Sequence, residues 1–225
     1  MEERKSLILL LIWDAILVFC SAFSTTATLT GFHFMVDVPR MAEAPYLVTF
    51  TGLSNLFVGI AALLCFATRI VWKDPRLPVW AFLVKLGSVS MILITFLVTS
   101  AYLTPATGES WWKLYVNAGF FNHALTPVLA IVGFLAFERK VKVHRLHVLF
   151  TLIPMAAYEI LYSVRVFSHY DPNVETPLYY DIYGFARFGI WAYFGFLLLF
   201  LVLGAAFSFL FRLQNGRKKE KGRAE

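Results

Sequence analysis

A histidine lies in the middle of a long apolar stretch of this chain. His123 stands in the run Phe-Phe-Asn-His-Ala-Leu-Thr-Pro over residues 120–127. An ionisable side chain is costly to hold in hydrocarbon, so a membrane-embedded histidine is a candidate functional residue by default. The chemistry that it predicts is proton transfer as a general base. The alternative is a hydrogen-bonded packing residue without a catalytic role.

A second polar segment supplies hydroxyl groups that such a base needs. Residues 48–55 read Val-Thr-Phe-Thr-Gly-Leu-Ser-Asn. At a spacing of four, Thr51 and Asn55 share one helix face, while Thr49 points elsewhere. A hydroxyl nucleophile beside a histidine base is an acyl-transfer arrangement. Small and hydroxylated residues also let membrane helices pack closely, which is the structural alternative.

The histidine segment carries further polar groups. His123 and Thr126 are three residues apart and share a helix face, and Pro127 deprives the His123 carbonyl of its usual helical donor. The amide of Asn55 or Asn122 would donate a hydrogen bond to an oxyanion. These residues imply no metal ion and no organic cofactor.

Three more ionisable side chains fall inside apolar stretches. Asp14 and Lys85 have opposite charge and similar depth, which predicts a structural ion pair, although Lys85 could equally extend to the interface. Glu159 has no evident cationic partner. It is expected to be neutral and hydrogen-bonded, or to orient His123.

The composition predicts a membrane protein. Of the 225 residues, 59% are hydrophobic and only 15% are charged, whereas soluble domains are near 45–50% apolar and about 25% charged. Cys20 and Cys65 are interpreted as small buried hydrophobes. The N-terminal segment starts basic and turns apolar, as a signal peptide does, but Asp14 interrupts it. A retained first helix is therefore expected.

Six apolar blocks have the length that a transmembrane helix needs. They cover residues 6–25, 46–68, 79–103, 114–137, 148–166 and 186–211. The predicted fold is all-α, a six-helix membrane bundle in one domain over residues 1–211. A basic tail follows at 212–225.

The basic residues predict the orientation. Most of the 20 lysines and arginines fall at the N-terminus, in the second and fourth loops and in the tail. By the positive-inside rule both termini are cytoplasmic, and a multi-pass protein of the plasma membrane is expected. This placement explains the net charge of +6 without nucleic-acid binding. The tail would anchor the topology or contact anionic lipids.

Depth brings the two candidate residues to the same region of the bilayer. Thr51 lies about five residues below the outward face and His123 about nine, a difference of roughly 6 Å at the rise of a helix. The two are therefore expected to meet in an outward-facing pocket.

Several short motifs resemble those of a known family. These are Thr-x-x-Ser-Asn at 51–55, His-x-x-x-Pro at 123–127, Ile-Pro at 153–154 with Tyr158, and Tyr-Tyr-Asp-Ile-Tyr-Gly-Phe at 179–185. Together with the six spans they resemble a family of bacterial six-helix membrane proteins. That family is similar to the eukaryotic androgen-induced and androgen-dependent TFPI-regulating proteins. The resemblance covers roughly residues 46–185.

The resemblance implies an activity and two catalytic positions. The eukaryotic proteins hydrolyse fatty-acid esters of hydroxy fatty acids with a threonine nucleophile and a histidine. Thr51 matches that threonine, with Thr49 as the fallback, and His123 matches the histidine. Family members commonly have an acidic residue about ten positions after the histidine, where this chain has Gly133.

The sequence therefore predicts a lipid-ester hydrolase with a Thr51–His123 pair, in contact with membrane lipids. Asn55, Asn122, Thr126 and Glu159 are its expected supporting residues. The alternatives are a small transporter or membrane scaffold of the same fold, supported by Asp14, Lys85 and Glu159. A protease or acyltransferase that uses the same pair is also compatible with the sequence.

Overall fold

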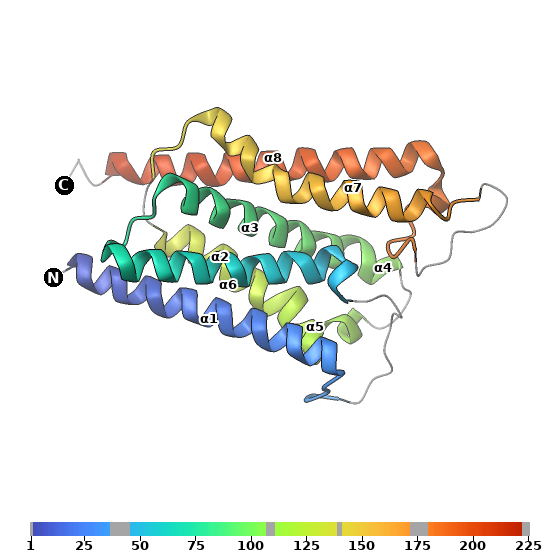
Figure 1. Cartoon of the computed structure of the whole chain (residues 1–225), viewed down its shortest axis with the longest axis horizontal. Coiled ribbons are helices and arrows are strands. Elements are labelled where there is room, and N and C mark those ends of the chain that lie inside the picture. The colour runs from blue at the N-terminus through green and yellow to red at the C-terminus, as the bar shows by residue number, and fades with distance from the viewer. Residues whose placement is uncertain (1, 37–45, 107–110, 139–140, 172–179, 222–225) are drawn as a thin grey trace.

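The computed structural model describes residues 2–36, 46–106, 111–138, 141–171 and 180–221. Within these residues all regular structure is helical. Six helices are long and apolar enough to cross a membrane, as predicted from the sequence. They lie side by side along the long axis of the molecule, and both chain ends lie at the same end of the bundle (Figure 1).

The first three spanning helices are continuous. They are α1 (Glu2–Thr30), α2 (Phe50–Trp72) and α3 (Val79–Val98). Helix α1 extends beyond the predicted 6–25 at both ends. Helix α2 begins four residues later than predicted, because Thr49 caps its N-terminus and the short 3-10 helix η1 (Tyr46–Val48) precedes it. Lys73 ends α2 in a left-handed conformation at φ 53°.

The third span continues beyond α3, and the fourth and fifth spans are divided into shorter elements. Helix α3 continues through the π-helical turn η2 (Thr99–Leu103) into α4 (Thr104–Ala106). The 3-10 helix η3 (Trp111–Tyr115), α5 (Ala118–Phe120), the π-helical turn η4 (Phe121–Leu125) and α6 (Thr126–Phe137) follow. The 3-10 helix η5 (Arg145–Leu152) leads into α7 (Ile153–Phe167), and η6 (Ala186–Phe188) precedes α8 (Ile190–Lys221).

The last helix extends beyond the predicted span at 186–211. Helix α8 runs on to Lys221, so most of the basic tail predicted from residue 212 continues the helix.

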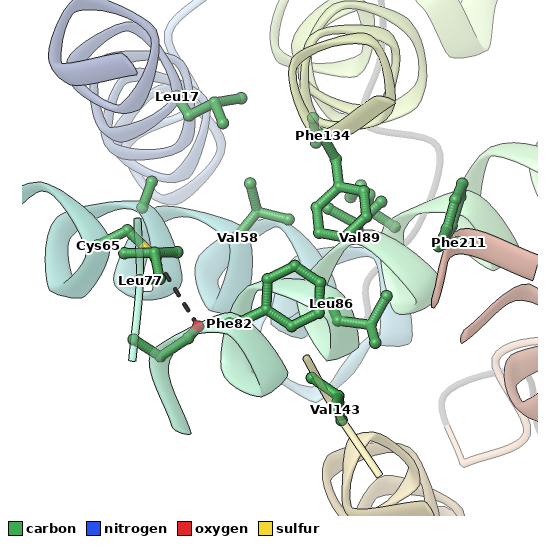
Figure 2. Packing of buried hydrophobic residues seen from close by; sticks show 14 of the residues in the cluster. Leu17, Val58, Cys65, Leu77, Phe82, Leu86, Val89, Phe134, Val143 and Phe211 are labelled. Carbon is green, nitrogen blue, oxygen red and sulfur yellow. Dashed lines mark hydrogen bonds between the residues drawn. The ribbon is translucent and has the colours of Figure 1, made fainter. Parts of the chain in front are cut away.

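Helix α3 lies at the centre of the bundle. In its span 67% of the most apolar window is buried, against 22–39% in the other five. Figure 2 shows Phe82, Leu86 and Val89 of α3 packed among side chains from the helices around it, including Phe134 of α6 and Phe211 of α8. The interior of the molecule is thus organised around α3.

The outer faces of the helices are apolar as well. Leu161 of α7, Leu198 of α8 and Leu63 of α2 are each more than half exposed. Apolar surface on this scale is unfavourable in water and favourable in lipid. The arrangement fits a multi-pass membrane protein.

Candidate functional site

Four buried charged side chains form a closed network near the end of the bundle that holds the termini. Lys85 Nζ lies 2.8 Å from Asp14 Oδ1 and 2.6 Å from Glu138 Oε2. Arg69 Nη2 lies 2.5 Å from Glu138 Oε1, and Arg69 also pairs with Asp14. The predicted Asp14–Lys85 pair is confirmed. Two acids and two bases leave this four-residue ion network neutral, as buried charges require.

A cavity lies nearer the opposite end of the bundle. The start of α2, the C-terminal half of α3, the middle of α7, the segment before η6 and the N-terminal half of α8 form its walls. The empty space in the cavity and at its mouth is about 450 Å³, part of which is open to the outside. Its walls are mainly aromatic and aliphatic side chains, and Thr51, Thr95, Thr99 and Glu159 also border it, but the surface that these residues present to the cavity is apolar.

His123 contacts a threonine, but a different one from the predicted partner. Its Nδ1 lies 3.1 Å from the hydroxyl oxygen of Thr99. Thr99 lines the cavity and is 1% exposed. The structure describes both His123 and Thr51, and no hydrogen bond joins these two residues. The edge of the His123 ring also faces Tyr115, with 6.2 Å between ring centroids.

Both members of the Thr99–His123 pair lie in π-helical turns. In η4 the N–H of Thr126 donates to the carbonyl of Phe121, five residues earlier. In η2 the N–H of Thr104 donates to Thr99 in the same pattern, and the Thr104 hydroxyl donates to that carbonyl at 2.7 Å. Wide turns of this kind are rare and frequently occur at functional sites.

Thr51 lies on another wall of the same cavity. It is in the first turn of α2, next to Tyr183. Burial raises the pKa of the Tyr183 phenol, and hydrogen bonding with Tyr158 and with the Thr51 hydroxyl acts in the opposite direction. The Tyr183 oxygen also accepts a hydrogen bond from the N–H of Phe50 at 2.7 Å. The candidate nucleophile therefore has a phenol, and not the histidine, as its immediate neighbour.

The fallback nucleophile Thr49 has a structural role. Its hydroxyl donates to the carbonyl of Tyr46 at 2.8 Å and accepts from the N–H of Gly52 at 2.9 Å. This is the N-cap of α2, which satisfies an N–H that the helix itself leaves unpaired. Both functions of the hydroxyl are occupied, so Thr49 is a poor nucleophile.

The two expected oxyanion donors are engaged elsewhere. Asn55 Nδ2 donates to the carbonyls of Thr51 and Asn122 at 2.9 and 3.1 Å. Asn122 accepts from the Tyr46 phenol at 2.9 Å and donates to the Thr28 hydroxyl at 3.4 Å. Neither amide lines the cavity. They join α1, α2 and η4, so their role here is structural.

Thr126 is fully buried, and its hydroxyl has no hydrogen-bond partner among the described residues. It lies outside the cavity wall.

The indole ring of Trp13 fills the space beside Gly133, the position at which the resemblance led us to look for an acidic residue. A Cβ placed on Gly133 would lie 1.8 Å from Nε1 of Trp13. The Trp13 N–H donates to the carbonyl of Leu129 at 3.1 Å. The indole of α1 therefore occupies the space that a side chain at 133 would need, and Glu138 belongs to the four-residue ion network.

Glu159 borders the cavity, and its unpaired oxygen is enclosed by the protein. It is 7% exposed, and its Oε1 has no hydrogen-bond partner among the described residues. No ion pair to Glu159 and no contact between Glu159 and His123 occurs among the described residues.

Sequence reasoning missed three residues of these sites. Thr99 follows a long apolar helix and precedes a serine, with no motif around it. Tyr183 belongs to the motif at 179–185, but its place beside Thr51 does not follow from the sequence. Arg69 lies just after the predicted span 46–68, although Ile70, Val71 and Trp72 follow it and indicate that the helix continues.

Comparisons of the chain with protein-family models, with curated proteins and with solved structures found no match. The function is therefore argued from the site.

Proposed function

We propose that this multi-pass membrane protein hydrolyses lipid esters in the cavity, with a threonine hydroxyl and His123 as the reacting groups. One observation carries the proposal. The hydroxyl of Thr99 lines an apolar cavity and lies 3.1 Å from Nδ1 of His123. At this distance a hydrogen bond can hold a catalytic histidine in position.

The residues suggest a division of roles. Thr51 is the proposed nucleophile, and Thr99 holds His123 through Nδ1, as the third member of a catalytic triad does. Such a partner takes the place of the acid that Gly133 excludes. His123 accepts the proton of the attacking hydroxyl and returns it to the departing alcohol. Water then cleaves the acyl-threonine and releases the fatty acid.

The developing oxyanion needs a hydrogen-bond donor in the cavity. The phenol of Tyr183, beside Thr51, is proposed for this role in place of Asn55 and Asn122. A preorganised donor at that position is usually a major contribution to acyl-transfer rates.

The substrate class follows from the cavity walls. Phe50, Ile94, Val98, Leu197 and Phe200 present apolar surface suited to an acyl chain. The cavity lies nearer the end of the bundle away from the termini. With the predicted orientation, an ester would enter from the outer leaflet of the plasma membrane.

The test compares threonine and histidine variants in the purified protein. Thr51→Ala, Thr99→Ala and His123→Ala are treated with a fluorophosphonate probe and with a panel of acyl esters. Loss of the base or of the nucleophile should lower turnover by roughly 10²–10⁴. Thr26→Ala and His147→Ala, at exposed positions, should retain full activity.

The labelled residue distinguishes the two hydroxyls. A phosphonylated Thr51, found by peptide mass spectrometry, supports the proposed roles. A phosphonylated Thr99 keeps the hydrolase but makes Thr99 the nucleophile. Equal turnover in the wild type and all three variants would exclude the enzyme.

The transporter alternative has lost part of its support. Asp14 and Lys85 are enclosed within the four-residue ion network, and Glu159 is the one of these three residues that borders the cavity. Flux in proteoliposomes that disappears in Glu159→Gln, without hydrolysis in any form of the protein, would favour transport.

A further inference from the structure

We infer that the surface where η5 meets the C-terminal part of α8 binds an anionic phospholipid, with the lipid phosphate between Arg145 and Arg212. This η5–α8 surface consists of Lys142, Arg145, Arg212 and the exposed apolar side chains of η5. In Figure 1 the segment η5, drawn in yellow before α7, lies beside α8 in the half of the bundle that holds the termini. The cavity lies nearer the other end, so the inference does not rest on the ester-hydrolase proposal.

The packing of η5 on α8 places two arginines on facing sides of these elements. The hydroxyl oxygens of Thr151 and Ser208 lie 2.9 Å apart and join η5 to α8. Arg212 lies one turn beyond Ser208 and therefore shares its face of α8. Arg145 lies six residues before Thr151, and residues three apart are eclipsed in a 3-10 helix. Both arginines therefore border the outer end of the contact between η5 and α8.

The side chain of Arg212 is held in position for an anion. Its Nε donates to the carbonyl of Val143 at 2.9 Å, two residues before Arg145. Its terminal amino groups have no hydrogen-bond or ion-pair partner among the described residues. A guanidinium group fixed in this way keeps donors that match a phosphate. The ring of His144 accepts from the N–H of Leu146 at 3.3 Å, which caps η5 and orders the backbone at Arg145.

The η5–α8 surface carries positive charge that no acid of the same segments offsets. Lys142 and Arg145 are exposed, and Arg212 is half-exposed. Residues 141–153 and 190–213 contain no Asp or Glu, and Glu138, the nearest earlier acid along the chain, is enclosed in the four-residue ion network. Because like charges on facing elements repel each other, an anion between the arginines is favourable.

The position of the surface indicates a lipid as the source of this anion. Arg145 is the first residue of the span Arg145–Phe167, and Arg212 is next to the last residue of the span Ile190–Leu213. Basic residues at the ends of spans lie at the level of lipid headgroups. The side chains of Leu146, Leu149 and Phe150 on η5 are 49–60% exposed and can contact acyl chains. A phospholipid matches both the charged and the apolar part of the surface, whereas a soluble anion matches only the first.

The binding experiment titrates a fluorescent phosphatidylglycerol into the full-length protein in micelles of an uncharged detergent. Fluorescence polarisation reports binding, with unlabelled phosphatidylglycerol and phosphatidylcholine as competitors. Phosphatidylglycerol should compete at least about tenfold more strongly, because the choline group cancels the charge of its own phosphate. Equal competition by the two lipids would overturn the inference.

A soluble competitor distinguishes the lipid from a free anion. The compound sn-glycerol 3-phosphate carries a phosphate without acyl chains, so it should not displace the fluorescent lipid at the concentrations at which phosphatidylglycerol does. Displacement by sn-glycerol 3-phosphate as effective as that by phosphatidylglycerol would show a site for soluble anions and overturn the inference.

The variants Arg145→Gln and Arg212→Gln test the two arginines. Each should weaken phosphatidylglycerol binding about fivefold, the contribution of one basic residue near an anionic headgroup. Arg4→Gln is the matched control, because it removes the same charge at the same end of the bundle, on α1, which lies across the bundle from α8 (Figure 1). It should change the affinity by less than about twofold, since salt screens distant charges. The basic residues after 213 are the same in every variant. Equal affinities in the three variants would overturn the inference.

A measurement on the wild type covers variants that do not fold. A phosphatidylglycerol with a photoreactive group in its acyl chain is irradiated with the protein, and peptide mass spectrometry locates the adducts. They should fall on residues 146–150, and excess unlabelled phosphatidylglycerol, but not phosphatidylcholine, should suppress them. Adducts spread over the outer faces of the bundle without such suppression would overturn the inference. Ester hydrolysis is not measured, so this inference and the hydrolase proposal fail separately.

Discussion

At the scale of single residues, buried ionisable side chains are paired at one end of the bundle and unpaired nearer the other. Asp14 and Lys85 are paired and enclosed, whereas Glu159 borders a cavity and its Oε1 has no hydrogen-bond partner among the described residues. Burial alone therefore does not identify a functional charge in a membrane protein. What distinguishes Glu159 is that its partner is missing from the described chain.

The four-residue ion network yields a prediction about stability. Lys85→Met leaves two buried acids with one base, and we expect it to destabilise the protein by about 3–5 kcal/mol. The double variant Asp14→Asn with Lys85→Met should recover much of this loss, because the remaining Arg69–Glu138 pair is neutral. Unfolding in detergent micelles measures both.

The matched control for this network is an exposed pair. Arg76 lies 3.2 Å from Glu3, and both side chains are more than 60% exposed. Arg76→Met should change stability little, because exposed ion pairs contribute little. If the double variant Asp14→Asn with Lys85→Met were as unstable as Lys85→Met alone, the explanation from charge balance would be contradicted.

At the scale of elements, the π-helical turns decide which residues meet. Pro127 has no N–H to donate to the carbonyl of His123, and the chain forms η4 just before it. A π turn places one extra residue in the helix, which rotates the side chains on either side of it. The facing turn η2 contributes Thr99. Two irregular turns thus bring together Thr99 and His123. Sequence spacing in regular helices would not have predicted this contact.

The packing of α1 on α6 yields a prediction at this scale. Gly133→Ala would force its Cβ onto the Trp13 ring and should cost about 1–3 kcal/mol. Trp13→Leu combined with Gly133→Ala should relieve the clash and recover stability relative to Gly133→Ala. Thermal unfolding in detergent measures the difference.

The control for this substitution is a glycine with free space. An added Cβ on Gly195 of α8 meets nothing within 4 Å. Gly195→Ala should therefore be neutral or slightly stabilising, since alanine favours helix. A Gly133→Ala protein as stable as Gly195→Ala would show that the indole moves aside without cost.

At the scale of the whole molecule, both chain ends lie at one end of a six-helix bundle. The basic loops lie at that same end, because α2 and α6 both finish there. With the positive-inside rule, this end is expected to face the cytoplasm and the cavity end to face outward.

Cysteine labelling in intact cells measures this orientation. A membrane-impermeant maleimide should label Phe32→Cys, beyond α1, and not Lys142→Cys, between α6 and η5, until the cells are opened. Cys20 and Cys65 are buried, so they contribute no background. Labelling of Lys142→Cys in intact cells, with Phe32→Cys protected, would reverse the predicted topology.

Much of the architecture could be predicted from the sequence. The six spans follow from the length of the apolar blocks, because a helix is the structure that satisfies its own backbone hydrogen bonds in lipid. The Asp14–Lys85 pair followed from opposite charge at equal depth. Helix ends were less predictable, because the Thr49 cap and the continuation of α8 depend on local hydrogen bonds and not on hydropathy.

The sequence by itself determined that His123, Thr51 and Glu159 are costly or unusual side chains inside apolar helices. Only the tertiary structure decided their partners: Thr99 for His123, Tyr183 beside Thr51, and none within the described chain for Glu159. The physical reason is that depth in a bilayer is a one-dimensional quantity that sequence spacing measures. Which helix faces meet depends on the rotation of each helix, and in this protein the π-helical turns and close packing at Gly133 set that rotation.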